Sequence, residues 1–462
     1  MTLFQRLLVL ALAVTALRIV VLAVSPTDLF FDEAQYWAWG QSLDWGYFSK
    51  PPLIGWVIRT FTEIAGSDAP FWVRLAAPVF HGATSIILGL FIASIYRPAA
   101  IWTAAVYLSM PIITIGSWMI STDTIMAPFL AAAIWMWWRY LHTFSLRIAL
   151  LAGVFAGTAA MAKYAGSYFF LIVFLTAIFA PPRPRVSGIL TALIGFFVIL
   201  AQNLLWNVQN GMVTFSHTAD NASWGGLSTL NWTGLLEFAL AQAFVIGPVF
   251  FVVWLATLPK AVDRAERYLL AASLPIVLLI CGQAVISQAY ANWAFAAYLT
   301  AAPLVALRLC RGKAWKTLYA GLAVNVALSV IVSLLIMWPS LVRNASDRYM
   351  GRTDLANTIL ETAQAPVVAT DRQLLADLTY AAQRNGGLNK VFAYNPSDVW
   401  HHWYDMVAPL PANTDAVFVA ETNVPPACNG STIQPFSEIP VEEGAYSGRT
   451  YGLYHFSLNC TE

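Results

Sequence analysis

The chain has 462 residues, of which 59% are hydrophobic and 11% are charged, and its formal net charge is +1. A mean hydropathy of +0.64, with 19 Trp, 27 Phe and 18 Tyr, is typical of a polytopic membrane protein and excludes an ordinary soluble globular domain. A net charge so close to zero gives no indication of nucleic-acid binding, which requires a concentrated basic patch.

Apolar segments recur along the first three quarters of the chain and predict about 11 transmembrane helices, because a bilayer core needs roughly 20 apolar residues per helix. Residues 1–24 resemble a signal peptide, but they lack a convincing small-x-small cleavage site and further apolar segments follow. We therefore interpret them as an uncleaved first span. The expected spans are 4–24, 77–96, 99–117, 122–141, 147–164, 166–181, 187–206, 236–257, 268–287, 292–309 and 316–338.

The basic residues between these spans alternate, which predicts the topology. Every second connection carries Lys or Arg, whereas the opposite connections near 118–121, 207–235 and 288–291 contain neither. By the positive-inside rule, the N-terminus is cytoplasmic and the C-terminal part lies on the other side. The basic residues are Arg97, Arg139, Arg147, Arg183, Arg185, Lys260, Arg264, Arg267, Arg308, Arg311, Lys313 and Lys316.

The composition changes sharply after Pro339 and predicts two domains. Residues 1–339 form a transmembrane domain, whose first outer loop, about 25–76, has tryptophans among polar residues and is expected to form short amphipathic helices in the membrane interface. Residues 340–462 form a soluble extracytoplasmic α/β domain with a helix at 371–384 and strands at 390–394 and 415–420. The predicted fold class is a polytopic α-helical membrane protein with this C-terminal domain.

The first outer loop carries the most informative residues, Asp32 and Glu33, in the sequence Phe-Phe-Asp-Glu-Ala-Gln-Tyr that starts at Phe30. Two adjacent acids at a membrane boundary carry a free-energy cost, so we expect them to have a function. Asp32 is suited to act as a general base on a hydroxyl, although it could equally cap a helix. Lys50 precedes two prolines that fix its direction and suits a phosphate oxygen, with contact to lipid headgroups as the alternative.

Further candidates lie in the other outer connections. Asp123, at the start of the fourth span, is either an acid of the site or a helix cap. Lys163 is an unusual cation at an outer helix end and would be explained by a phosphate or an acidic partner. Asn207, His217 and Asn292 have side chains suited to sugar hydroxyls, but such side chains equally suit a solvated loop.

Metal and disulfide chemistry receive little support from the sequence. The segment His-His-Trp-Tyr-Asp at 401–405 could bind a metal or an acceptor, but a surface turn is favoured. No CxxC motif or Cys/His cluster indicates zinc. Cys428 and Cys460 could form a disulfide in an oxidising compartment, and the sequence leaves this open.

These motifs occur in an order that resembles the ArnT-like and protein-mannosyltransferase-like membrane glycosyltransferases with the GT-C fold. The resemblance covers residues 25–310 and is carried by the Asp-Glu pair, Lys50-Pro51-Pro52-Leu53, Thr122-Asp123, Lys163-Tyr164, Leu205-Trp206-Asn207 and Asn210-Gly211. It implies inverting transfer of a sugar from a polyprenyl-phosphate donor on the extracytoplasmic face. The motif is richer in aromatics than expected of aminoarabinose transferases, and Ser49 rather than an acid precedes Lys50, so the identity of the sugar is not carried over.

The resemblance also implies roles for individual residues. Asp32 would be the base or would orient the acceptor hydroxyl, with Glu33 supporting it, and Asp123 would be a second acid. Lys50, and Lys163 with it, would hold the donor phosphate. Contacts to the sugar or acceptor are expected from Tyr36, Asn207, His217 and Asn292. No cofactor is required by the sequence, although some relatives bind a divalent metal.

The expected acceptor is an envelope glycolipid such as lipid A or the lipopolysaccharide core, with protein second, and a monomer in the bacterial inner membrane, among membrane lipids, is expected. The main alternative is a secondary transporter of a lipid-linked or small anionic substrate, against which stand the odd number of spans and the absence of a repeated half. A lipid-linked oligosaccharide ligase is a further alternative, but such proteins usually carry their large loop late among the spans.

Overall fold

The computed structural model describes residues 1–222, 230–258, 263–387, 390–397, 399–411, 414–428 and 431–456. The chain divides into two compact units. The first, here named the helical unit, comprises Met1–Val24, Lys50–Ile54 and Arg74–Leu334. The second, the mixed unit, comprises Ser25–Ser49, Gly55–Val73 and Leu335–Glu462. Cys460 lies outside the described residues, so the disulfide considered between Cys428 and Cys460 also lies outside them.

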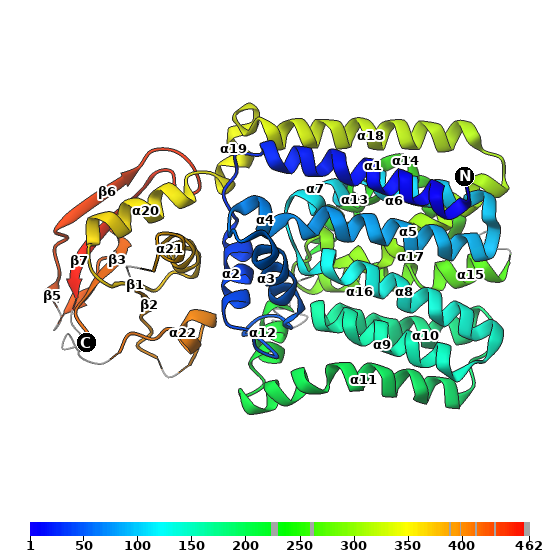
Figure 1. The fold of residues 1–462 in the computed structure, drawn as a ribbon, viewed down its shortest axis with the longest axis horizontal. Coiled ribbons are helices and arrows are strands. Elements are labelled where there is room, and N and C mark those ends of the chain that lie inside the picture. The colour runs from blue at the N-terminus through cyan, green and yellow to red at the C-terminus, as the bar shows by residue number, and fades with distance from the viewer. Residues whose placement is uncertain are drawn as a thin grey trace. The chain divides into compact units, whose positions relative to one another are not determined.

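Helices make up the helical unit, and Figure 1 shows many of them running side by side. Helix α9 packs against both α8 and α11. A Cβ atom at Gly153 of α9 would lie 2.0 Å from the carbonyl oxygen of Ala192 on α11, so only glycine permits this approach. The helices are α1 (Leu3–Val24), α5 (Ala76–Tyr96), α6 (Ala100–Ser109), α7 (Pro111–Trp118), α8 (Thr122–Thr143), α9 (Leu146–Ala162), α10 (Tyr168–Phe179), α11 (Val186–Gln209), α12 (Val213–Ala222), α13 (Trp232–Ile246), α14 (Pro248–Thr257), α15 (Arg264–Ala271), α16 (Leu274–Ile286), α17 (Phe295–Arg311) and α18 (Trp315–Met337), with 3-10 turns at Arg97–Ala99, Tyr164–Ser167 and Ala291–Ala294.

Six helices among the described residues are long and apolar enough to cross a membrane, or seven if one bent pair counts as a span. The expected count of about 11 is therefore not confirmed, and two of the expected segments form shorter apolar helices, Leu146–Ala162 and Tyr164–Phe179. The six are Leu3–Val24, Pro70–Ser109, Val186–Gln209, Arg264–Ile286, Ala291–Arg311 and Trp315–Met337.

The span expected at 236–257 is wrong as a single straight helix, because α13 and α14 meet at an angle of 107°. Gly247 stands at the break with φ of 98°, a conformation that favours glycine, and Pro248 opens the next helix. The Asn325 side-chain amide donates to the carbonyl of Ile246 at 2.9 Å, which satisfies a backbone group that the break exposes.

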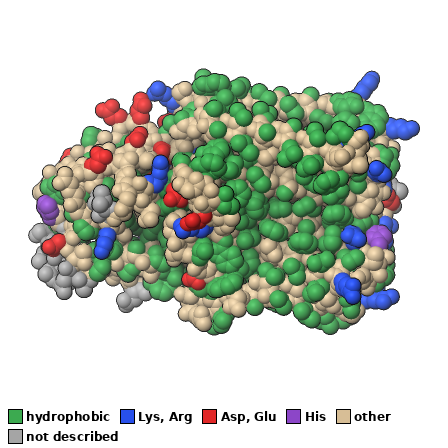
Figure 2. Space-filling view, viewed as in Figure 1, with side chains coloured by type: hydrophobic (Ala, Val, Ile, Leu, Met, Phe, Trp, Pro, Cys, Tyr) green, Lys and Arg blue, Asp and Glu red, His purple; other side chains and the backbone are tan. Residues whose placement is uncertain are grey.

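Arg264, Arg308 and Arg311, three of the basic residues that alternate in the sequence, come together at one end of the helical unit. Figure 2 shows blue side chains at the end where α15 lies, beside a body of largely hydrophobic side chains. There Arg308 donates to Glu266 at 2.5 Å, and Arg264 contacts His142 at 3.1 Å. The unit thus separates a basic end from its apolar body, as expected of a membrane protein.

The mixed unit contains a five-stranded sheet in the order β2-β1-β3-β7-β6. Strands β2, β1 and β3 are parallel, with Val367 opposite both Val391 and Val417, whereas β7 runs antiparallel to β3 and β6. The expected helix at 371–384 and strands at 390–394 and 415–420 are present as α21, β2 and β3. The elements are α2 (Phe31–Gln41), α3 (Leu53–Ala65), α4 (Pro70–Arg74), α19 (Arg343–Ser346), α20 (Arg352–Ala363), β1 (Val367–Ala369), α21 (Arg372–Arg384), β2 (Val391–Ala393), α22 (Trp403–Val407), β3 (Ala416–Glu421), β4 (Ala427–Cys428), β5 (Ser431–Thr432), β6 (Ser437–Val441) and β7 (Arg449–Phe456), with 3-10 turns at Pro339–Val342 and Asp347–Tyr349.

The first loop differs from expectation, because 25–49 and 55–73 form one compact unit with the C-terminal residues rather than with the transmembrane helices. The Trp37 indole donates to Asp68 at 2.8 Å, and its ring packs edge-on against Tyr380 of α21 at 4.9 Å. Trp37 and Trp39 are fully buried, so the expected location in the membrane interface is wrong for these two residues. Packing that joins residues more than 300 positions apart leaves no local pattern in the sequence.

Buried charges hold this loop in place. Arg352 donates to the carboxylate of Asp377 at 2.9 Å, and the Tyr446 hydroxyl donates to the same oxygen at 2.6 Å. The backbone N–H of Arg352 donates to the side chain of Asp28 at 2.9 Å, and its guanidinium lies over the rings of Phe30 and Tyr446. The side chains of Arg352 and Asp377 are at most 4% exposed. Each buried charge therefore needs the opposite charge of the other to offset the loss of its hydration.

Burial raises the pKa of Asp377 to about 6, and Arg352 offsets only part of this effect. Because the folded-state pKa exceeds that of an unfolded chain, the folded state binds the proton more tightly, and stability falls as the pH rises from about 4 to about 6. We expect the thermal midpoint of the wild type to fall across this window, with a loss of at most about 3 kcal/mol. The Asp377→Asn variant should lack this dependence, whereas Asp354→Asn, at an exposed position of α20, should retain it.

Candidate functional site

Asp32 and Glu33 both lie in the first turn of α2, but they make different contacts. The Glu33 carboxylate accepts the N–H of Phe30, the N-cap residue, at 3.0 Å, and Glu33 is 1% exposed. Asp32 is not the cap, and its side chain is 38% exposed. The capping alternative considered for Asp32 is therefore wrong, and it is Glu33 that stabilises the start of α2.

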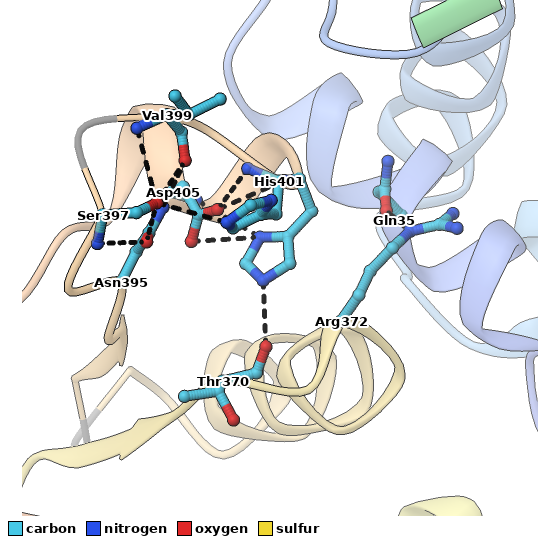
Figure 3. Close-up of polar contacts among 9 residues, drawn as sticks. Gln35, Thr370, Arg372, Asn395, Ser397, Val399, His401 and Asp405 are labelled. Atoms are coloured by element: carbon cyan, nitrogen blue, oxygen red, sulfur yellow. Dashed lines mark hydrogen bonds and ion pairs between the residues drawn. The ribbon is translucent and has the colours of Figure 1, made fainter. Parts of the chain in front are cut away.

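Arg372, the first residue of α21, engages Asp32. Its Nη2 donates to Asp32 Oδ1, and its Nε donates to Gln35 Oε1 at 2.7 Å, a contact visible in Figure 3. The guanidinium also lies over the ring of Phe31 at 5.0 Å. Asp371 caps α21 by accepting the N–H of Leu374 at 2.8 Å, so the turn that carries Arg372 is itself held. Arg372 is not among the candidates predicted from the sequence, because nothing local marks it as a partner of a residue 340 positions away.

The segment 401–405 is a structural turn at the start of α22. His402 and Asp405 form a capping box, and His402 Nε2 lies 3.0 Å from the carbonyl oxygen of Thr370. Both residues are buried, so the favoured surface turn is wrong in its exposure. Among the described residues, no group of three or more His, Cys, Asp or Glu side chains could hold a metal.

Tyr36 follows Asp32 by one turn of α2 and is almost completely buried, at 8% exposure. Its ring centroid lies 5.1 Å from that of Trp39, which in turn stacks on Tyr47 at 4.7 Å. Burial raises the pKa of Tyr47 and of the fully buried Tyr404. The α2 segment is therefore anchored by aromatic packing, and Tyr36 belongs to that packing.

A second polar cluster lies in the helical unit and joins three predicted residues. Lys163 donates to both carboxylate oxygens of Asp123 at 2.8 Å, and the Asn292 amide donates to one of them at 2.9 Å. Ser121 caps α8 through the N–H of Thr124, so the capping interpretation of Asp123 is wrong. Of the two explanations offered for Lys163, the acidic partner is present.

Asn207 lies close to this cluster, because it contacts Tyr164, the residue that follows Lys163 in the chain. The Tyr164 hydroxyl donates to Asn203 at 2.8 Å and accepts from the Asn207 amide at 3.2 Å. The Tyr164 ring stacks on Phe215 of α12 at 4.7 Å. Asn207 is completely buried, and within the described part of the chain its Oδ1 has no hydrogen-bond partner.

Two further predicted residues, His217 and Lys50, also belong to the helical unit. His217 lies on α12 and is half-buried. Lys50 is half-buried in the short segment before α3 that is assigned to the helical unit, the unit that also contains Lys163. Asp32, Glu33 and Tyr36 belong to the mixed unit. The candidate residues are thus divided into an α2 group and an Asp123–Lys163–Asn292 group.

Comparisons with known proteins converge on one type of enzyme. The family model of dolichyl-phosphate-mannose-protein mannosyltransferases matches residues 49–206. The lipid A galacturonosyltransferase RgtD of Rhizobium johnstonii is 33% identical over 468 residues, which cover 98% of both chains.

Two solved structures of ArnT from Cupriavidus metallidurans share the fold at 15% identity. The apo structure matches with a TM-score of 0.63, covering 90% of this chain and 93% of its own. The structure bound to undecaprenyl phosphate matches with a TM-score of 0.65, covering 98% of this chain and 99% of its own.

The Asp123–Lys163 pair should be strongly coupled, because the two side chains are only 9% and 21% exposed and removal of one leaves the other charge unpaired. We expect Asp123→Asn and Lys163→Met each to lower the thermal midpoint in detergent. The double variant should lose less stability than the sum of the losses in the two single variants. The coupling should be on the order of 1–3 kcal/mol. The exposed Arg343–Glu443 pair is the control and should show less than about 1 kcal/mol. Additive effects at Asp123 and Lys163 would contradict the assigned contact.

Proposed function

Since the chain belongs to the ArnT-like and protein-mannosyltransferase-like membrane glycosyltransferases, we propose that it transfers a sugar from a polyprenyl-phosphate donor to an envelope glycolipid of the lipid A type. The observation that carries this proposal is the 33% identity, over 98% of both chains, to a lipid A galacturonosyltransferase. The shared fold with an ArnT solved with undecaprenyl phosphate supports a donor of that class. A uronic acid is the first sugar to test.

The proposed location is the bacterial inner membrane, with the N-terminus in the cytoplasm and the C-terminal residues in the periplasm. The chain is a multi-pass membrane protein, and the basic end of its helical unit supports this orientation through the positive-inside rule. On that face the resemblance implies a polyprenyl-phosphate sugar as the donor.

We assign the base to Asp32. In the proposed reaction the acceptor hydroxyl oxygen attacks the anomeric carbon, its proton passes to the carboxylate, and the bond from that carbon to the phosphate oxygen breaks with inversion. Arg372, which also donates to Gln35, orients the Asp32 side chain, which remains 38% exposed and can reach a substrate hydroxyl. Glu33 supports this arrangement by capping the helix that carries Asp32.

We assign the leaving phosphate to lysines of the helical unit. Charge develops on the phosphate oxygen as the sugar departs, and a fixed cation stabilises it. Lys50 stands before two prolines that restrict its backbone. Lys163 has three N–H donors, of which two are directed at Asp123, so one remains for a phosphate oxygen. In this arrangement Asp123 orients Lys163, a different role from the second acid implied by the resemblance.

We assign the sugar and acceptor contacts to buried and half-buried polar side chains of the helical unit. The unpartnered Oδ1 of the buried Asn207 suits a hydroxyl donor from the substrate. Asn292 and His217 lie on outer connections of the same unit, whereas the burial of Tyr36 favours a packing role. A divalent ion is not required by this scheme, in which lysines neutralise the phosphate.

Deleting the gene should remove one sugar-sized mass from lipid A or its precursors, as measured by mass spectrometry of envelope glycolipids. Expression of the wild type should restore that mass, and Asp32→Asn should not, because it lacks the proton-accepting carboxylate while keeping the side-chain shape. Glu63→Gln, which changes an exposed carboxylate on α3, should restore it fully. An unchanged glycolipid profile after deletion would contradict a lipid A acceptor and favour a protein acceptor. Retained transfer by Asp32→Asn would contradict the assignment of Asp32 as the base.

Lys50→Ala should impair use of the donor far more than use of the acceptor, because the cation acts on the phosphate. With purified protein and a polyprenyl-phosphate sugar, we expect kcat/KM for the donor to fall about 100-fold, while the acceptor KM stays within a few fold. Lys316→Ala, at an exposed position of α18, is the matched control. An unchanged donor dependence in Lys50→Ala would contradict this role and favour the alternative, in which Lys50 contacts lipid headgroups.

A further inference from the structure

The mixed unit contains a cavity of about 410 Å³ that none of the proposed catalytic residues lines. It lies at the carboxyl ends of the parallel strands, where Thr370 follows β1, Tyr394 follows β2 and Glu421 ends β3. Among the three parallel strands β1 is the middle one, and the chain continues from it to β2 on one side before crossing to β3 on the other. Open α/β sheets bind ligands at such a switch point, and the volume is in the range of about 300–1,000 Å³ typical of small-molecule sites.

Aromatic and polar side chains share the lining of this cavity. Phe418 and Tyr451 are 6% and 3% exposed and belong to its lining, and Tyr394 packs edge-on against Phe418 with ring centroids 5.8 Å apart. Burial raises the pKa of Tyr451 to about 12, so its phenol stays neutral and retains its proton. The carboxylates of Asp371 and Glu421 also line the cavity. Apolar faces beside hydrogen-bonding edges are the two surfaces that a sugar ring presents, with its C–H groups on one face and hydroxyls at its rim.

The charge of the lining selects among sugars. Two carboxylates and no Lys or Arg occur among the described residues that line the cavity, and Arg449 pairs with Glu421 from outside it at 2.9 Å. A phosphate or a uronic acid would meet like charge here, whereas hydroxyl and ammonium groups would meet acceptors. The cavity therefore disfavours the anionic parts of the donor and favours a neutral or amine-bearing saccharide.

We propose that this cavity binds a neutral or amine-bearing saccharide unit of the acceptor glycolipid. The proposal rests on the proposed function and extends it by giving the mixed unit a site for the acceptor. Asp371 lines the cavity and caps α21, and the next residue, Arg372, holds Asp32. A saccharide bound in the cavity would thus contact the turn that orients the proposed base.

Saturation-transfer NMR on the full chain in lipid nanodiscs tests this binding without requiring turnover. The probes are N,N′-diacetylchitobiose, a neutral disaccharide, and galacturonic acid, an anionic sugar. We expect saturation transfer to the disaccharide only, and at least about tenfold weaker binding by Tyr394→Ala, which removes one ring of the lining. Glu438→Gln on β6, outside the lining, is the control and should bind as the wild type does.

Glu421→Gln adds a kinetic readout. We expect it to raise the acceptor KM about tenfold while kcat is retained, because it removes a contact to the bound saccharide and not to the reacting atoms. Absence of binding by the disaccharide, binding unaffected by Tyr394→Ala, or preferential binding of galacturonic acid would each overturn the proposal. Binding that depends on Tyr394 in a protein that transfers no sugar to lipid A would support the cavity and contradict the proposed function.

Discussion

The buried pair between Arg352 and Asp377 is the contact on which the mixed unit depends. It fixes the guanidinium against the ring of Phe30, while the adjacent backbone N–H holds Asp28. Both charges are buried, and removing either one would leave the other unpaired, so the pair keeps Arg352 in the position where Asp28 and Phe30 of the first loop contact it. The residues held here directly precede Asp32, and the candidate base is thereby tied to the C-terminal part of the chain.

The same electrostatic constraint governs the helical unit. A lysine among apolar helices must find an anion or reach water, and Lys163 finds both oxygens of Asp123. Asn292 completes the contacts of that carboxylate. This arrangement keeps an ammonium group in a defined direction, which is the property that a phosphate-binding lysine needs. Stability and proposed chemistry thus follow from one pairing.

The proposed activity divides its tasks between the two units. The mixed unit contains the carboxylate assigned as base and the cavity assigned to the acceptor saccharide, and both adjoin the turn at Asp371 and Arg372. The helical unit contains Lys50 and Lys163, which are assigned to the donor phosphate.

The sequence by itself determined the membrane class, the predominance of apolar helices over the first three quarters of the chain, the α/β elements near 371–421 and the motifs that mark the family, because hydropathy, periodicity and short motifs are local properties. It also indicated that Lys163 needs a partner. Only the tertiary structure decided that Arg372 holds Asp32, that Glu33 rather than Asp32 caps α2, and that Gly247 breaks a span. It also decided that Trp37 and Trp39 are buried in the mixed unit. These outcomes depend on contacts between residues far apart in the chain, or on a competition between neighbouring side chains for one backbone group, and neither leaves a periodic signal in the sequence.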